Sequence, residues 1–326
     1  MNSRERFRET MRYGTPDRVP LFEEGLRDDV RERWAEQGLP LDADLTRLFR
    51  TDVRERIPVE LDPLPDLERW PESLAELKIL EERLDPDDPA RFPADWAERV
   101  RAWRSREHLL ELFVHRGFFL SMGVDAWTRF EQAVLQIHDA PDLVHGIMEA
   151  HSRLAVGLIE RVLQDVEIDF ATFSEPIGGN DRPLLSPKTY REFVMASYLP
   201  ILETLRRHGV ETIVYMTYAN SRALLPVVAD AGFDCLWACE VNPEAMDYRA
   251  IRREFGRDLR LIGGIDLDAL REGKEAVRAE METRARPLLA EGGYIPLADG
   301  RVRVDVPYEN YALYRRMLEE ITEDAR

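Results

Sequence analysis

The residues of this chain best suited to chemistry are acids, arginines and a tyrosine that directly follow short apolar runs. Glu240 ends the very apolar run of residues 235–239. A carboxylate there is costly unless it is paired or used, which makes it a candidate for chemistry. Glu175, Tyr218 and Asp299 occupy similar positions after other runs. Partly buried carboxylates and tyrosines can transfer protons, so these four are the predicted catalytic residues.

A second set of polar residues is suited to binding a small anion. Arginine holds a carboxylate through two parallel hydrogen bonds, and amide and acidic groups fix the orientation of a polar ligand. Asn242, which follows the same apolar run as Glu240, is a further polar candidate. The predicted substrate-binding residues are Glu23, Arg27, Arg116, Asn220, Asp266 and Arg301.

Several of these residues have a structural alternative that the sequence leaves open. Glu23 can cap the helix that follows it, and Arg116 can belong to a structural ion pair. Asp266 stands where a helix N-cap is expected, so capping competes with substrate binding. The polar loop at residues 178–181 is either a turn or a lid over a pocket.

The elements that position these residues alternate between strand and helix in the second half of the chain. Such alternation, with right-handed crossovers, predicts a parallel sheet. Ser186-Pro187 supplies an N-cap and a first-turn proline for one helix, and Gly209 supplies its C-terminal glycine. The predicted strands here are Ile168–Phe173, Glu211–Met216, Phe233–Ala238, Leu259–Gly263 and Gly293–Leu297, and the predicted helices are Ser186–His208, Ser221–Ala231, Tyr248–Phe255 and Lys274–Glu291.

The first half adds three predicted strands, Val19–Phe22, Ile57–Leu61 and Leu110–Val114. The proline-rich stretch 62–96 is interpreted as an excursion that covers one end of the sheet. Eight strands predict a (β/α)8 TIM barrel, formed as a single domain over residues 1–326. In such a barrel the carboxyl ends of the strands meet at one rim, so we expect the candidate residues to surround one cavity.

Composition restricts the possible partners. A formal net charge of -18 repels nucleic acid, so a nucleic-acid partner is not expected. The chain has no apolar stretch of membrane-spanning length, and its start has no signal-peptide pattern. Cys235 and Cys239 are too few for a disulfide framework and are predicted to be core thiols. A cytoplasmic protein is therefore expected.

Several short motifs are spread along the chain. They are Glu5-Arg6-Phe7, Pro16-Asp17-Arg18-Val19-Pro20, Leu185-Ser186-Pro187-Lys188-x-Tyr190-x-Glu192-Phe193, Asp258-Leu259-Arg260-Leu261-Ile262-Gly263-Gly264-Ile265-Asp266, Gly292-Gly293-Tyr294-Ile295-Pro296 and Pro307-x-Glu309-Asn310-Tyr311. Taken in order and spacing, these motifs resemble the uroporphyrinogen decarboxylase superfamily over nearly the whole chain. The resemblance implies a TIM barrel, a dimer, and a pocket at the carboxyl ends of the strands. It also implies either cofactor-independent decarboxylation or zinc-dependent methyl transfer between corrinoids and thiols.

The sequence departs from both branches of this family. The zinc ligands of the methyltransferases, His-x-Cys and a later Cys, correspond to Met216-Thr217-Tyr218 and the neighbourhood of Gly300. No metal or other cofactor is therefore expected. The arginine-rich segment of the porphyrinogen decarboxylases is replaced by Glu23, Glu24 and Arg27, whose acids would repel a polycarboxylate.

Three hypotheses remain open from the sequence. The leading one is a decarboxylase-type lyase for a small organic acid, with Arg27, Arg116 and Arg301 orienting the anion. In this hypothesis Asp299, Glu175 or Tyr218 moves the proton. The alternatives are methyl transfer or demethylation with a corrinoid protein as partner, and a barrel that binds a small molecule without turnover.

Overall fold

The computed structural model describes residues 1–125, 127–240 and 244–324. By compactness the chain divides into two units, which are described separately. The terminal unit comprises residues 1–54, 107–109 and 235–326, and the central unit comprises residues 55–106 and 110–234.

The central unit contains three parallel strands, β2 (Leu109–His115), β3 (Phe170–Glu175) and β4 (Ile213–Tyr218). Glu111 of β2 lies opposite Phe170, and Thr172 of β3 lies opposite Val214. Nearly every strand residue is buried. Parallel strands buried on both faces are typical of α/β proteins, in which helices cover the sheet.

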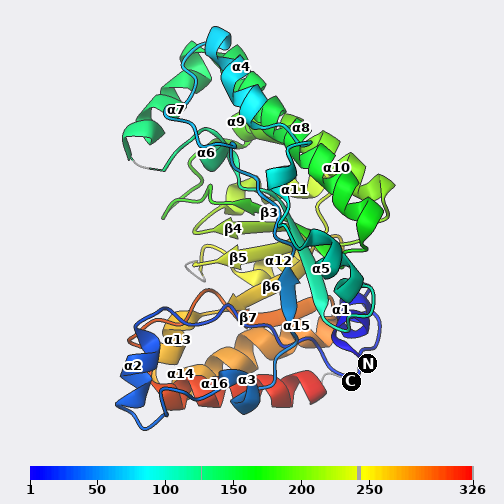
Figure 1. The fold of residues 1–326 in the computed structure, drawn as a ribbon. Coiled ribbons are helices and arrows are strands. Elements are labelled where there is room, and N and C mark those ends of the chain that lie inside the picture. Colours follow the sequence, from blue (N-terminus) through cyan, green and yellow to red (C-terminus); the bar gives the residue numbers. More distant parts are fainter. Residues whose placement is uncertain (126, 241–243, 325–326) are drawn as a thin grey trace. The chain divides into compact units, whose positions relative to one another are not determined.

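Long helices accompany these strands. Figure 1 shows α8 (Pro141–Asp165) beside α10 (Ala196–Arg207), with α4 (Leu74–Arg83) packed on α8. Gly146 lets α4 approach closely, because a Cβ there would lie 2.4 Å from Leu77 Cδ2. The predicted excursion at residues 62–96 therefore contains a helix that belongs to the packed layers of this unit.

The terminal unit contains β5 (Cys235–Cys239), β6 (Arg260–Ile265) and β7 (Tyr294–Ala298), which also pair in parallel and in chain order. Helices α13 (Leu267–Glu272), α14 (Lys274–Glu280) and α16 (Tyr308–Asp324) contact one another beside them (Figure 1). Both units thus repeat the strand–helix–strand pattern of an α/β fold.

The remaining elements complete the described chain. They are α1 (Ser3–Met11), α2 (Val30–Ala35), α3 (Leu45–Leu48), β1 (Arg54–Arg56), a 3-10 turn (Pro89–Arg91), α5 (Trp96–Trp103), α6 (Phe118–Ser121), α7 (Trp127–Asp139), α9 (Pro187–Tyr190), a π turn (Arg191–Met195), a 3-10 turn (Arg222–Leu224), α11 (Leu225–Asp230), α12 (Tyr248–Phe255), a second π turn (Met281–Ala285) and α15 (Arg286–Glu291).

The prediction of an α/β fold with parallel strands is confirmed, and so is the helix Tyr248–Phe255. Ser186 caps its helix by accepting a hydrogen bond from Thr189 N at 3.1 Å. Cys235 and Cys239 are buried thiols outside any disulfide bond, as predicted. No helix in the described ranges combines the length and apolarity needed to cross a membrane.

Two predicted strands are wrong, and the described residues contain seven strands instead of eight. Val19–Phe22 forms no strand because Asp52 takes its hydrogen bonds: Leu21 N donates to the Asp52 carboxylate, and Leu21 O accepts from Asp52 N. Ile57–Leu61 contains Pro58 and turns back on itself, with Val59 N donating to Ile57 O. The strand in this region is β1, three residues earlier.

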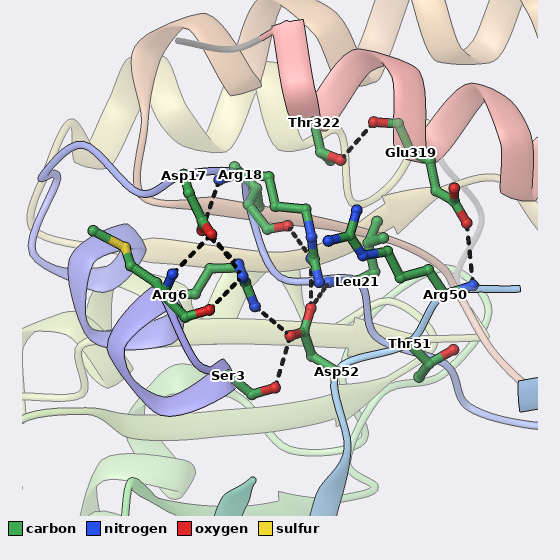
Figure 2. A network of polar contacts seen from close by, with 12 residues as sticks. Ser3, Arg6, Asp17, Arg18, Leu21, Arg50, Thr51, Asp52, Glu319 and Thr322 are labelled. Carbon is green, nitrogen blue, oxygen red and sulfur yellow. Dashed lines mark hydrogen bonds and ion pairs between the residues drawn. The ribbon is translucent and has the colours of Figure 1, made fainter. Parts of the chain in front are cut away.

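A buried charge network in the terminal unit accounts for the N-terminal motifs (Figure 2). Arg6 donates to Asp52 at 2.7 Å and to Asp17 at 2.8 Å, and Arg18 donates to Asp52 at 2.6 Å. Burial acts to raise the pKa of Asp52, but the bonds from Arg18 and Leu21 N hold that pKa below its usual value. These motif residues hold α1 against the chain and have a structural role.

Candidate functional site

A cavity of about 400 Å³ lies in the central unit, at the carboxyl ends of its strands. Phe113, Ser174 and Tyr218 line it from β2, β3 and β4, and the segment 56–62 with Arg116 and Leu120 completes the wall. Ligand sites of α/β proteins occupy this position because the loops after parallel strands converge there. The volume is in the range of pockets that hold small organic molecules.

Two guanidinium groups face this cavity. Arg56, at the end of β1, lies with its guanidinium 3.5 Å from the centroid of the Phe113 ring. Within the described residues its guanidinium makes no hydrogen bond or ion pair. Arg116 pairs with Asp62, which leaves some of its five N–H donors available. An arginine that is held on an aromatic face without a carboxylate partner is well placed to receive an anion.

Tyr218 is the last residue of β4 and supplies a hydroxyl group to the same cavity. It is partly buried, and its Oη lies 3.5 Å from Met216 Sδ. A phenol in the same cavity as two guanidinium groups can donate a proton to a ligand that they hold.

Glu175, one residue beyond Ser174, lies behind this wall and is fully buried. Its Oε2 accepts hydrogen bonds from Tyr198 Oη at 2.5 Å and Tyr190 Oη at 3.2 Å, and its Oε1 accepts from Phe118 N at 2.9 Å. Tyr190 Oη also lies 3.1 Å from Tyr215 Oη. The result is a buried cluster of one carboxyl group and three phenols.

The electrostatics of this cluster follow from its burial. Burial raises the pKa of Glu175 to about 7, although the bonds from Tyr198, Phe118 N and Tyr190 act in the opposite direction. Burial also raises the pKa of Tyr190, Tyr198 and Tyr215 well above 10. Near neutral pH Glu175 therefore exchanges its proton while the tyrosines keep theirs.

Gly117 is required for this arrangement. Its φ is +92°, and a Cβ there would lie 2.8 Å from Glu175 Oε1 and 2.7 Å from Ser174 O. The glycine lets the chain after β2 pass close to the carboxyl group, so that Phe118 N reaches it.

Arg116 and Tyr218 both line the cavity, whereas the Asn220 side chain makes hydrogen bonds to backbone groups. Asn220 Nδ2 donates to Asp181 O at 2.8 Å, and its Oδ1 accepts from Arg222 N at 3.1 Å. Gly179 also bridges to Asn220, so the loop at residues 178–181 is fastened to the end of β4. The roles predicted for these residues in binding or catalysis stay predictions.

In the terminal unit, Asp299, Glu240 and Arg27 are neighbours. Arg27 pairs with Glu240 at 3.1 Å, and Glu240 N donates to Asp299 O at 2.5 Å. The Asp299 carboxylate is buried and accepts from Leu267 N at 3.1 Å. Glu240 has a φ of +48°, a strained conformation for a residue with a side chain. Such strain is common at functional sites and keeps Glu240 a candidate. Asn242 lies outside the described residues.

Three other predicted substrate ligands are engaged structurally. Glu23 accepts from Tyr311 Oη at 2.7 Å and pairs with Arg315. Asp266 caps α13 by accepting from Asp268 N at 2.9 Å, and Arg301 donates to Leu26 O at 2.6 Å.

The two acids that follow residue 22, Glu23 and Glu24, are neutralised by arginines in the folded chain. Glu24 pairs with Arg54 at 2.9 Å, and Glu23 pairs with Arg315. Repulsion of a polycarboxylate by Glu23 and Glu24 is therefore weaker than the sequence alone indicates.

Sequence reasoning missed Arg56. The predicted strand was placed at residues 57–61, where Arg56 precedes the strand, but β1 occupies Arg54–Arg56 and puts Arg56 at its carboxyl end. The available signal was the spacing Arg54-x-Arg56, which places two arginines on one face of a strand just before Pro58.

In the described parts of the chain, no group of three or more His, Cys, Asp or Glu side chains is arranged to hold a metal ion.

A search of curated proteins finds no match to this sequence. The family model for uroporphyrinogen decarboxylase (URO-D) matches residues 124–320, which include β3 to β7 and the residues Glu175 and Tyr218. The α/β fold, the strand-end cavity and this match together show that the chain belongs to the uroporphyrinogen decarboxylase family.

Proposed function

We propose that the chain is a cofactor-independent carboxy-lyase that removes CO₂ from a small organic acid. The observation that carries this proposal is the unpaired Arg56 guanidinium, which is fixed on the Phe113 ring in a cavity of about 400 Å³ that Arg116 and Tyr218 also line. The proposal includes the (β/α)8 barrel that the family resemblance implies. The parallel strand–helix repeats in both units support that part.

In the proposed reaction, Arg56 and Arg116 bind the substrate carboxylate and orient its bond to the neighbouring carbon. That bond breaks, CO₂ leaves, and the electron pair stays on the carbon. The substrate must delocalise this pair through its own carbonyl or unsaturated group. Tyr218 Oη delivers a proton to the carbon, and solvent returns one to the phenolate.

Glu175 does not line the cavity, and we assign it a positioning role in this scheme. Its bonds to Tyr198, Tyr190 and Phe118 N fix the segment after β2 and the end of β3, from which Arg116 and Ser174 reach the cavity. The proposed roles of Asp299 and Glu240 in catalysis, and of Arg27 and Arg301 in substrate binding, are tested by measuring CO₂ release.

Zinc, which the methyltransferase branch of the family implies, does not fit the residues present. Tyr218 stands where the branch has a thiolate, and a phenol with a neighbouring methionine is a poor zinc donor set. At the position of the third ligand, a Cβ on Gly300 would lie 3.3 Å from Glu240 Cγ, tighter than an ordinary contact. No step of the proposed reaction uses a metal.

The test is CO₂ release from a panel of three- to six-carbon keto and unsaturated acids, with purified full-length protein. We expect Arg56→Ala to raise KM about 10- to 100-fold, because a charge-assisted hydrogen bond is lost. Tyr218→Phe lowers kcat about 100-fold or more, because the proton donor is gone. Arg153→Ala, which removes an exposed ion pair with Glu81 in the same unit, is the matched control and leaves both constants unchanged.

Two outcomes would contradict the proposal. Demethylation of a methylated substrate that depends on added corrinoid, without CO₂ release, would favour methyl transfer. Tight binding of an acid, abolished by Arg56→Ala but without turnover, would favour a binding barrel.

A further inference from the structure

A second, much smaller recess adjoins the cavity and is lined by two buried histidines. His115 ends β2 and is 3% exposed, and His151 lies on α8 and is 8% exposed. Their ring centroids are 6.1 Å apart, and both rings line a space of about 10 Å³. This is close to the smallest volume that holds one water molecule.

The hydrogen bonds of the two rings determine what each presents to the recess. His115 Nδ1 accepts from Gly117 N at 3.0 Å, so the proton of the neutral ring is on Nε2. His151 Nε2 is also buried and has no hydrogen-bond partner. We assign it the lone pair, because a second N–H directed into the same small space would oppose the N–H of His115.

Neither Nε2 atom has a hydrogen-bond partner among the described residues. Burial lowers the pKa of both imidazoles, so both rings are neutral at pH 7. The residues that carry this unpartnered donor and this unpartnered acceptor line the same recess. Leaving both groups unsatisfied is unfavourable, and a ligand of matching chemistry recovers this cost.

A hydroxyl oxygen has the matching chemistry, because it accepts a hydrogen bond and donates one. A carboxylate or halide ion accepts only and would face the His151 lone pair, and an ammonium donates only and would face the His115 N–H. The recess shares Leu61, Asp62, Arg116 and Leu120 with the 400 Å³ cavity. A substrate held by Arg116 therefore has its neighbouring substituent close to the two histidines.

We propose that the recess is a site for one hydroxyl oxygen, occupied by water in the free protein and by the hydroxyl group of a hydroxy acid in the complex. The second half of this statement rests on the proposed function and specifies its substrate class. Asp62 and Arg116, which also line the recess, supply a second acceptor and a second donor for a water molecule. A substrate hydroxyl group has a single O–H, which it donates to His151.

The first experiment examines the free, full-length protein. Histidine ¹⁵N spectra are expected to show His115 as the Nε2–H tautomer and His151 as the Nδ1–H tautomer. A crystal structure is expected to show one oxygen within about 3.2 Å of both Nε2 atoms. An empty recess, or an imidazolium at either position at pH 7, overturns the site.

The second experiment identifies the source of the oxygen by titrating two acids of equal length, with and without a hydroxyl group. We expect the hydroxy acid to bind about tenfold more tightly, and the recess water to be displaced in its complex. His151→Phe keeps the ring that stacks on Trp70 but removes both nitrogens, and it abolishes the preference. His145→Phe on the same helix, where the ring stacks on Phe193, is the control and keeps the preference.

The failures of the two proposals are distinguishable. Equal binding of the two acids by the wild-type protein overturns the assignment of the recess to a substrate hydroxyl. If neither acid binds while an ordered oxygen bridges the histidines, the water site is supported and the proposed function is what fails.

Discussion

Burial of a single residue, Glu175, makes the stability of the fold depend on pH. Its pKa is about 7, above the value of 4.5 for an exposed glutamate, because burial disfavours the charged form. The folded protein therefore holds this proton more tightly than the unfolded chain. Consequently the free energy of unfolding falls as pH rises from about 4.5 to about 7, by on the order of 3 kcal/mol from this group.

We predict that Glu175→Gln removes this pH dependence. The amide keeps an acceptor for Tyr198 but does not titrate, so the variant gains stability relative to wild type as pH rises. The gain between about pH 5 and about pH 8 is on the order of 3 kcal/mol, measured by urea unfolding at the two pH values. Glu203→Gln, at an exposed position on α10, is the control. Parallel pH profiles for E175Q and wild type would refute the buried, protonated carboxyl.

The two histidines of the recess act in the opposite direction. Burial lowers the pKa of His151 to about 4 and lowers that of His115 well below 6.5. Their stabilising contribution is complete above pH 6.5, the pKa of an exposed histidine, and is lost as pH falls toward about 4. His151→Phe is predicted to flatten the acid limb of the stability profile. An unchanged acid limb would show that His151 is solvated in the folded protein.

At the scale of elements, Asp266 shows how capping and ligand binding compete for one side chain. It occupies the N-cap of α13 and accepts from Asp268 N, and its own N–H donates to Glu280 Oε1 at 2.9 Å. An aspartate engaged in this way satisfies an orphan backbone donor of the helix.

We predict that Asp266→Ala lowers the free energy of unfolding by about 1 kcal/mol and that Asp266→Asn leaves it nearly unchanged, since asparagine is an equally good N-cap. Denaturant unfolding measures both. If Asp266→Asn instead raises KM for the acid substrate while stability is unaltered, the residue binds substrate through its charge, as the sequence analysis first suggested.

Element boundaries explain most of the differences between prediction and structure. The strands after residue 165 were identified, but each begins one or two residues later than its apolar run. Glu175 and Tyr218 are therefore the last residues of β3 and β4 and do not lie in the following loops. Alternation and β-branching identify a strand, whereas its ends depend on which backbone groups find a partner, and this is a tertiary property.

At the scale of the molecule, the charge network around Asp52 connects segments that are far apart in sequence. Asp52 pairs with Arg6 and Arg18, and its side chain is 2% exposed. Removing the negative charge of Asp52 leaves the buried guanidinium groups of Arg6 and Arg18 without this partner. The resulting loss in the free energy of unfolding is larger than the net contribution of the ion pairs to stability.

We predict that Asp52→Asn destabilises the protein by about 3–5 kcal/mol, measured by denaturant unfolding. The matched control is Asp17→Asn in the same network, whose side chain is 40% exposed. This change is expected to cost about 1 kcal/mol or less. Equal effects of the two substitutions would show that the network is solvated.

The sequence by itself determined the α/β class, the parallel strand–helix repeats, the family and the strand-end candidates, because periodicity, caps and motif order are local properties. The tertiary structure decided which candidate residues are engaged in structural contacts and which line a cavity. It placed the Arg56 guanidinium on the Phe113 ring, paired Arg116 with Asp62, and paired Glu23 and Glu24 with arginines. It also left two buried histidine nitrogens without partners in residues that line one recess. Whether a charged group is paired, buried or open to a ligand depends on neighbours that are distant in the chain, and only the folded molecule brings them together.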